Sequence, residues 1–234
     1  MPNPFFILTW ARSGSYHLAS LLNSAPDIVC HKELFKPKVL EIPVQLRRKW
    51  KLSLEKRDAD PLGFLEKLRG LEPDKHVGFK LFPNHIAYNP VLRELFESTD
   101  WNIICLTRAP VDIFASVQKA KNYAYWTSKQ AAPAEFERKI PFDPAAYDKF
   151  IKGYNGFKHR VRLLKRNKRA IQIDYSELAD ESKLQSVLTY IGSKALAGSL
   201  SSEQEQQVGP RPIDLFERPD EVLDYARSKE AAKS

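Results

Sequence analysis

The chain has few of the residues and segments that mark disulfide-rich, metal-binding or membrane-spanning proteins. It contains 2 cysteines in 234 residues, Cys30 and Cys105, and both lie in or at the end of apolar stretches, where a cysteine is usually a small buried hydrophobe. No apolar run approaches the roughly 20 residues that a membrane span needs, and no basic segment precedes the first apolar run, as it would in a secretory leader. We therefore expect a cytoplasmic protein with reduced thiols, no membrane span and no bound metal.

Glycine is also scarce, at 9 residues, and this argues against two common nucleotide-binding loops. An apolar run at residues 5–10 is followed by a short polar segment in which Gly14 is the single glycine. The dinucleotide fingerprint needs three glycines, and the phosphate loop of nucleotide triphosphatases needs the spacing G-x-x-x-x-G-K-[ST], which is absent. The sequence therefore disfavours a dehydrogenase and a kinase.

The same segment has the features of an anion site. The apolar run can form a buried strand, and a loop of small residues separates it from apolar residues at helical spacing in 18–22. Unpaired backbone N–H groups at the start of such a helix attract a phosphate. Arg12 and the hydroxyls of Ser13 and Ser15 add charge and further donors. We expect a phosphate group to bind here.

The sequence R-S-G-S at residues 12–15, with the apolar helix and the stretch 26–35 after it, resembles the 5′-phosphosulfate loop and next strand of sulfotransferases that use PAPS (3′-phosphoadenosine 5′-phosphosulfate). A second match is Arg108, which follows the apolar run 102–107, together with Ser116 eight residues further on. In the family, an arginine and a serine at this spacing bind the 3′-phosphate. About two helical turns separate the pair, so a guanidinium and a hydroxyl can converge on one dianion.

Weaker matches extend the resemblance over most of the chain. Residues 170–178 are similar to the last core strand and its turn, and residues 208–213 fall where the family has a loop over the adenine. The resemblance implies that PAPS is the cofactor, that PAP is the product, and that Tyr175 and Arg211 also bind the cofactor. Tyr16 and His17 stand where the family has threonine and tryptophan. The lost threonine hydroxyl puts activity in question, unless Tyr16 replaces it from a longer side chain.

Apolar runs alternate with helical stretches along the chain. The predicted strands are residues 5–10, 27–30, 77–81, 102–107 and 170–174, and the predicted helices are residues 16–23, 61–68, 90–97, 110–125 and 144–166. Several prolines directly follow Asp or Asn, as they do at the first position of a capped helix. The alternation predicts an α/β fold, a three-layer sandwich with a central parallel sheet of about five strands and helices on both faces. No linker or repeat interrupts it, so we expect a single sulfotransferase-like domain over residues 1–234.

Polar side chains follow the predicted strands at the edge where parallel sheets bind their ligands, beyond the carboxyl ends. In chain order they are Arg12, then His31 and Glu33, then Lys80, Asn84 and His85, and finally Arg108. Sulfuryl transfer needs a cradle for the departing phosphate, a cation where charge develops, and a base for the proton of the acceptor.

We assign the cradle to six consecutive residues, with Arg12 as the cation: Arg12, Ser13, Gly14, Ser15, Tyr16 and His17. Lys80 is either a second catalytic cation or a surface lysine with a buried stem. Glu33 is the candidate base, expected one strand away from the phosphate loop, and its alternative role is a carboxylate at the start of a helix. His31 and His85 are rival bases, because the intrinsic pKa of histidine suits the task better.

The net charge of +8 favours an anionic partner, and a doubly phosphorylated cofactor meets this expectation. Basic segments at residues 47–51 and 158–169 would also suit nucleic acid. However, apolar residues recur every three or four positions in 147–164, so the second segment is the solvated side of a helix. We therefore expect no nucleic acid partner, and a sulfotransferase acting on a hydroxyl or amine of a carbohydrate-like or glycolipid-like small molecule. The alternative is an inactive PAP-binding protein with the same fold.

Overall fold

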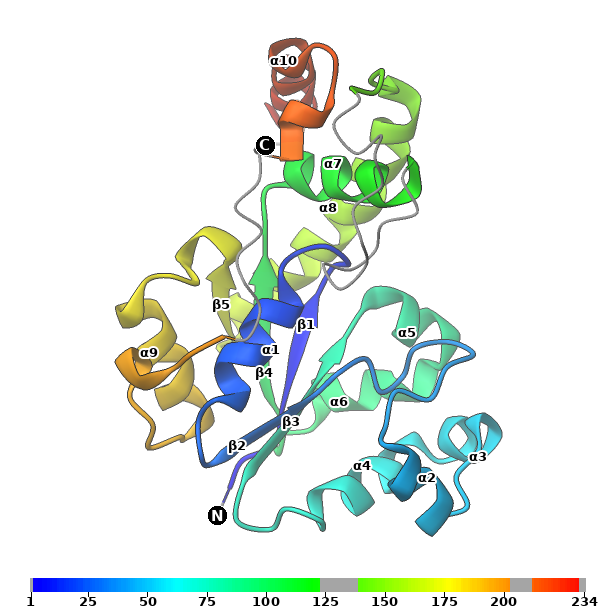
Figure 1. Ribbon diagram of the computed structural model, residues 1–234, viewed down its shortest axis with the longest axis vertical. Helices are drawn as coiled ribbons and strands as arrows, with labels where there is room; N and C mark the ends of the chain where they lie inside the picture. Colours follow the sequence, from blue (N-terminus) through cyan, green and yellow to red (C-terminus); the bar gives the residue numbers. More distant parts are fainter. Residues whose placement is uncertain (1, 123–138, 203–211, 232–234) are drawn as a thin grey trace. The chain divides into compact units, whose positions relative to one another are not determined.

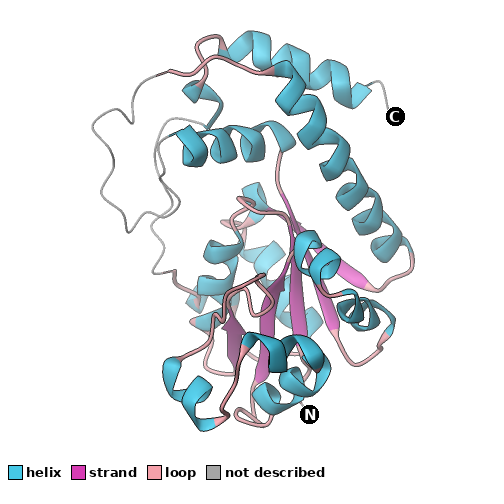
Figure 2. Cartoon of the chain, turned by 90° about the vertical axis from the view of Figure 1, so that its right-hand side faces the viewer, coloured by secondary structure: helices cyan, strands magenta, loops and turns pink. Residues whose placement is uncertain are grey.

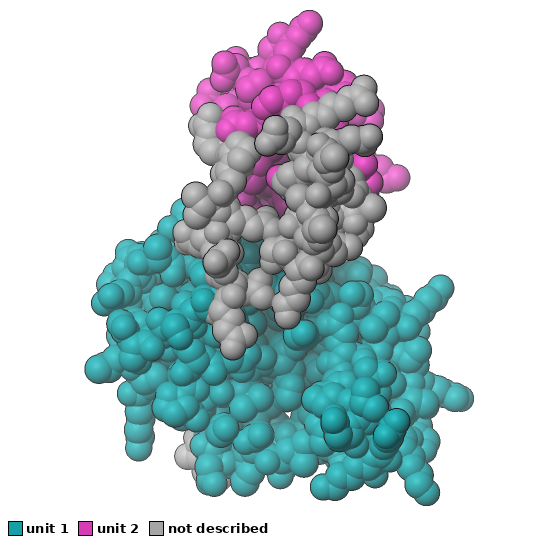
Figure 3. Space-filling model, viewed as in Figure 1, with its two compact units in different colours: residues 1–107, 161–204 teal, residues 108–160, 205–234 magenta. Residues whose placement is uncertain are grey.

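The structure is a computed structural model that describes residues 2–122, 139–202 and 212–231. The chain divides into two compact units, which are shown in different colours in Figure 3. Unit 1 comprises residues 1–107 and 161–204, and unit 2 comprises residues 108–160 and 205–234. The single domain expected from the sequence stays a prediction.

Unit 1 is built on a five-stranded sheet in the order β2-β3-β1-β4-β5 (Figure 1). All four strand pairs are parallel, which confirms the predicted sheet. Its strands are β1 (Phe5–Thr9), β2 (Ile28–His31), β3 (His76–Leu81), β4 (Asn102–Thr107) and β5 (Ala170–Asp174).

All five predicted helical stretches are helical in the structure, with residues 123–125 of the stretch 110–125 outside the described residues, and several further helices were not predicted. The helices are α1 (Ser15–Asn23), α2 (Val44–Lys49), α3 (Leu54–Ala59), α4 (Pro61–Arg69), α5 (Pro83–Tyr88), η1 (Pro90–Arg93), α6 (Glu94–Glu97), α7 (Pro110–Asn122), α8 (Pro144–Arg166), η2 (Tyr175–Glu177), α9 (Glu181–Ile191), η3 (Ala197–Ser199), η4 (Pro212–Leu215) and α10 (Pro219–Ala231). The predicted helix 90–97 is a 3₁₀ turn followed by one α-helical turn. None of the helices in the described part of the chain is long and apolar enough to cross a membrane.

The Asp-Pro and Asn-Pro pairs act as caps, as the sequence predicts. The Asp60 carboxylate accepts the N–H of Gly63 at 2.9 Å, and the Asn89 side chain accepts that of Val91 at 3.3 Å. The Asp143 carboxylate accepts the N–H of Ala146 at 3.0 Å. Each cap satisfies an N–H group that has no acceptor within its own helix.

The three inner strands β1, β3 and β4 are buried on both faces of the sheet, which explains why they are mostly apolar. One face packs on α1 and α9 through aliphatic residues, including Ile7, Leu22, Ile104 and Val187. The other face is aromatic, with Phe6 edge-on to Phe96 of α6 at 5.4 Å. Helices flank the strands in Figure 2, so the predicted three-layer arrangement is confirmed for unit 1.

Unit 2 has an aromatic core of its own. The ring of Phe114 in α7 packs against Tyr147 of α8 at 5.2 Å and is stacked with Phe216 at 6.1 Å. The backbone of Phe216 pairs with Ile140 in an isolated parallel bridge. The phenol of Tyr225 in α10 donates to the Asp148 carboxylate of α8 at 3.1 Å.

We expect Gly78→Ala to destabilise the protein by about 1–3 kcal/mol, the usual cost of overpacking a core. A Cβ on Gly78 of β3 would lie 2.2 Å from the ring of Phe5, a core residue of the adjacent strand β1. The matched control is Gly156→Ala in α8, where a Cβ meets nothing within 4 Å and helix propensity should add roughly 0.5–1 kcal/mol. Urea unfolding measures both variants, and a shift of the same sign in both would contradict the packing argument.

Candidate functional site

The predicted phosphate loop joins β1 to α1 in a tight turn. Gly14 has φ +86° and Arg12 has φ +70°, so both lie in the left-handed region that favours glycine. The carbonyl of Gly14 accepts the N–H groups of His17 at 3.0 Å and Leu18 at 3.1 Å. Helix α1 therefore begins at Ser15, and the N–H groups of its first turn are left without intrahelical acceptors.

Tyr175 lies against this loop, although it is far away in the sequence. A Cβ built on Gly14 would fall 2.2 Å from Cδ2 of the Tyr175 ring. Tyr175 follows β5, and a side chain at position 14 would meet its ring in addition to straining the left-handed backbone. Two of the predicted cofactor-binding residues thus come together.

The loop also contains a buried hydroxyl that nothing described in the protein satisfies. Ser13 is 0% exposed, and its Oγ has no hydrogen-bond partner among the described residues. Buried polar atoms normally have partners. Ser15, which is also buried, is the first residue of α1, so an anion at this helix end would meet two hydroxyls, backbone N–H groups and the helix dipole.

Lys80 is in the strand next to β1, where it pairs with Ile7, and it is 0% exposed. The alternative of a surface lysine is therefore wrong. Its Nζ lies 3.0 Å from the centre of the Tyr16 ring and 3.5 Å from Oε1 of Glu33. Burial lowers the pKa of Lys80 to about 8, and the nearby Glu33 carboxylate acts in the opposite direction.

Glu33 lies just beyond β2, with its side chain 12% exposed. The phenol of Tyr16 donates to its Oε1 at 3.5 Å, and Nε2 of His85 lies 3.8 Å from its Oε2. Burial and the Glu33 charge raise the pKa of the Tyr16 phenol, so it stays protonated as a donor. No helix begins at Leu34, which rules out the alternative of a helix-start carboxylate.

One part of the placement of Glu33 is wrong. Strand β2 is separated from β1 by β3, so Glu33 follows a strand two positions away from the phosphate loop. The chain leaves β1, passes through α1 to β2, and then returns to insert β3 between them. Glu33 still reaches the first turn of α1 because Tyr16 extends towards it.

The predicted histidines have different surroundings. His31 ends β2 and is half-buried, and burial lowers its pKa. His85 is wholly buried, and burial, with Lys80 next in importance, lowers its pKa to about 3. In α1, Nδ1 of His17 lies 3.0 Å from Oγ of Ser202. The three histidines therefore remain neutral more readily than free histidine.

Arg108 and Ser116, predicted for the 3′-phosphate, belong to unit 2. The backbone carbonyl of Arg108 accepts a hydrogen bond from the phenol of Tyr154 at 2.7 Å. Nε of the Arg108 side chain lies 3.9 Å from the Asp112 carboxylate. Ser116 is half-buried in α7. Arg211 lies outside the described residues.

Two residues that hold Glu33 and the segment after it were not predicted from the sequence. Arg57 of α3 is 0% exposed, and one of its guanidinium nitrogens donates to the carbonyls of Leu34 at 3.0 Å and Val39 at 2.8 Å. Glu41 accepts the backbone N–H of Glu33 at 3.3 Å. No local pattern marks either residue: Arg57 acts on a segment 18 to 23 positions earlier in the chain, and Glu41 acts on Glu33 within one irregular loop.

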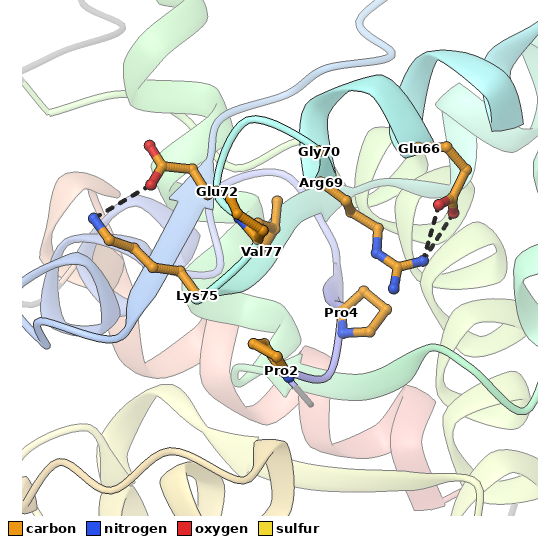
Figure 4. Close-up of a pocket in the computed structure, with 9 residues that line it drawn as sticks. Pro2, Pro4, Glu66, Arg69, Gly70, Glu72, Lys75 and Val77 are labelled. Atoms are coloured by element: carbon orange, nitrogen blue, oxygen red, sulfur yellow. Dashed lines mark hydrogen bonds and ion pairs between the residues drawn. The ribbon is translucent and has the colours of Figure 1, made fainter.

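A cavity of about 260 Å³ lies at the other edge of the sheet, beside the amino ends of β1 and β3 (Figure 4). Its walls include the ion pairs Arg69 to Glu66 at 2.8 Å and Lys75 to Glu72 at 3.5 Å. None of the residues predicted for the site lines it. In the described part of the chain, no group of three or more His, Cys, Asp or Glu is arranged to hold a metal ion.

Comparison with known proteins gives relatives at the level of fold. No protein-family model matches the sequence. Nodulation protein H of Rhizobium tropici is 24% identical over 197 residues, which cover 83% of this chain and 77% of that protein. The sulfotransferase domain of a Synechococcus olefin synthase superposes with TM-score 0.55 at 14% identity, covering 98% of this chain and 95% of its own. A mouse sulfotransferase complexed with PAP gives TM-score 0.52 at 13% identity, covering 99% and 84%.

We expect the protein to lose stability as the pH falls through about 6.5. The folded-state pKa values of His17, His31 and His85 all lie below the ordinary value, so on acidification the unfolded chain binds protons that the folded chain does not. For His85 alone, the free energy of unfolding falls by about 2 kcal/mol by pH 5. Urea unfolding at pH 7.5 and pH 5 tests this, with the exposed His159→Gln as the control. An undiminished pH dependence in His85→Gln would contradict it.

The resemblance stated from the motifs is thus confirmed by an independent criterion, the similarity of the fold to solved sulfotransferase structures. A five-stranded parallel sheet, a tight loop with a left-handed glycine before α1, and neighbours that are sulfotransferases agree with one another. The chain has the P-loop-like α/β fold of the sulfotransferases.

Proposed function

We propose that the protein is a PAPS-dependent sulfotransferase that transfers the sulfuryl group to a hydroxyl or amine of a small molecule. The observation that carries the proposal is the buried pair of Lys80 and Glu33, 3.5 Å apart. Tyr16 links this pair to the first turn of the helix that follows the phosphate loop. The fold and the PAP complex of a structural neighbour support the choice of cofactor.

The residues of unit 1 fit the 5′-phosphate end of this cofactor. The unpartnered Ser13 hydroxyl and the first-turn N–H groups of α1 are donors for a phosphate, and Arg12 supplies positive charge. Gly14 has no side chain, so the backbone of the loop can come close to the phosphate. Ser15, Tyr16 and His17 complete the cradle in this proposal, with the ring of Tyr175 against it.

Arg108 and Ser116 bind the 3′-phosphate in this proposal, and Arg211 also binds the cofactor. The support for these three residues is the resemblance of the motifs. Arg108 has the appropriate chemistry, since a guanidinium can bind a phosphate through two parallel hydrogen bonds.

The roles of the protein groups follow from their charges and surroundings. When bound, PAPS supplies the activated sulfuryl group. With its pKa lowered to about 8, Lys80 is still mostly protonated at pH 7 and can neutralise negative charge that develops on the departing phosphate. Arg12 has the same task from the loop. Glu33 accepts the proton of the acceptor, and His31 and His85 are the alternative bases at this edge.

The acceptor is proposed to be carbohydrate-like or glycolipid-like, on the resemblance of the motifs. The proposed location is the cytoplasm, where Cys30 and Cys105, both buried and free, would stay reduced. Nucleic acid is not the proposed partner, because the exposed basic residues of α8 lie opposite a buried aromatic stripe.

A specific observation favours the alternative of an inactive PAP-binding protein. The Tyr16 ring lies over Nζ of Lys80 at 3.0 Å, and its hydroxyl is directed to Glu33. The aromatic ring therefore covers the cation that the reaction would use, at the position where the family has a threonine. Transfer of labelled sulfate from PAPS separates the two functions.

Ser13→Ala should weaken PAP binding about tenfold or more, the value of a hydrogen bond to a charged group. Its stability should be unchanged or higher, because the Ser13 hydroxyl has no described partner. The control Ser53→Ala removes the cap of α3 and should lower stability by about 1 kcal/mol at unchanged affinity. Calorimetric titration with PAP, and with ATP and a short oligonucleotide as comparison ligands, is the measurement. Absence of PAP binding in folded wild-type protein would refute the proposed function.

Arg108→Ala should weaken PAP binding by on the order of 2 kcal/mol or more, with little change in Tm. The reason is the loss of a charge-assisted, bidentate contact to the 3′-phosphate. Arg218→Ala in unit 2, whose side chain is 75% exposed, is the matched control. Equal affinity of Arg108→Ala and wild type would remove the 3′-phosphate assignment.

Glu33→Gln should leave PAP affinity unchanged and lower turnover about a hundredfold or more, the scale of general base catalysis. Glu66→Gln is the control, since this carboxylate is exposed and pairs with Arg69. Circular dichroism checks that the variant is folded, because Lys80 loses its counterion. An undiminished rate would assign the role of base to His31 or His85.

A further inference from the structure

His85 combines complete burial with an unsatisfied ring nitrogen. It belongs to α5, directly after β3, and its ring is stacked on Phe82 with the centroids 5.0 Å apart. The side chain is 0% exposed, yet Nε2 has no hydrogen-bond partner among the described residues. A buried polar atom without a partner needs an explanation.

The other ring nitrogen defines the tautomer. The backbone N–H of Phe82 donates to Nδ1 of His85 at 3.3 Å, so Nδ1 is an acceptor and carries no proton. A neutral imidazole has one N–H group, which must then be at Nε2. This N–H lies towards Oε2 of Glu33, at 3.8 Å.

That distance is longer than a hydrogen bond. In enzymes without substrate, catalytic hydrogen bonds are often long and shorten in the complex. The other carboxylate oxygen, Oε1, already has Tyr16 and Lys80 at 3.5 Å each. The two oxygens of Glu33 therefore have different neighbours, and Oε2 faces only the imidazole among the interactions described.

We propose that His85 is a positioning residue, a neutral imidazole that donates its Nε2–H to Oε2 of Glu33 and orients this carboxylate as the base. The role of Glu33 as a base rests on the proposed function. The tautomer of His85 and its contact with Glu33 can be tested without that function. It also decides which of Glu33 and His85 is the base. A residue that is fixed as the hydrogen-bond donor cannot also accept the proton of the substrate.

The charges around the ring agree with a neutral imidazole. Lys80 of β3, Arg57 of α3 and Lys36 after β2 all act on His85 as cations, and burial acts in the same direction. The groups without positive charge are Glu33 and the protonated phenol of Tyr16 from α1. A further carboxylate, Glu41, pairs with Lys36 at 3.1 Å. A neutral ring among cations is a weak base but a sound hydrogen-bond donor.

Nitrogen NMR of histidine-labelled protein tests the tautomer directly, with His85→Asn providing the assignment. We expect the His85 signals to be those of the neutral Nε2–H form from about pH 5 to about pH 8. Glu33→Gln should shift the Nε2 signal of His85. A proton on Nδ1, titration within this range, or no response to Glu33→Gln would overturn the proposal, whether or not the protein has sulfotransferase activity.

Two matched variants test the consequence for turnover. In His85→Gln the amide nitrogen can take the place of Nε2–H, whereas in His85→Asn the amide oxygen can take the place of Nδ1 and accept the Phe82 N–H. We expect His85→Asn to lower kcat about tenfold and to move the acid limb of the pH profile upward. His85→Gln should stay near the wild-type rate, and PAP affinity should be equal in both.

Equal rates in the two variants would overturn the positioning role. If folded wild-type protein binds PAP but transfers no sulfate to any acceptor, the proposed activity fails. In that case the NMR experiment alone decides whether His85 contacts Glu33. The two failures are therefore distinguishable.

Discussion

A lysine that is wholly buried at the end of a central strand is the constraint on which the candidate site depends. Removing an ammonium group from water costs several kcal/mol, so the protein must place an anion or other attractive groups beside it. Lys80 has the Glu33 carboxylate at 3.5 Å and the Tyr16 ring at 3.0 Å. Because these groups come from β3, the segment after β2 and the first turn of α1, one buried charge brings three separate parts of the chain together.

A second buried cation supports the same segment from another side. Arg57 donates to the carbonyls of Leu34, Lys36 and Val39, in a stretch that has no helix or strand to pair its backbone groups. The irregular chain that follows Glu33 is therefore held by side-chain donors rather than by a helix or strand. This explains how an acidic residue in a loop can have a defined position next to Lys80.

The elements with a strong local signal were predictable. The strands Asn102–Thr107 and Ala170–Asp174 have the expected bounds. Asn102–Thr107 is the clearer case, because it is an apolar run that is buried on both faces of a parallel sheet. The short helix α2 was not predicted, since it has no buried residue and so no apolar periodicity. The position of Glu33 relative to β1 was wrong for a similar reason, because the order of strands in a sheet depends on crossovers that leave no local pattern.

Sequence alone is sufficient for the strand, the tight loop and the helix start at residues 5–23, since consecutive residues encode all three. It is also sufficient for the set of polar residues at the carboxyl ends of the strands. Only the tertiary structure decides that Lys80 is buried, that Tyr175 lies on Gly14, and that His85 faces Glu33. These three facts depend on distances between segments far apart in the chain, and burial turns such distances into changes of charge state and hydrogen-bonding role.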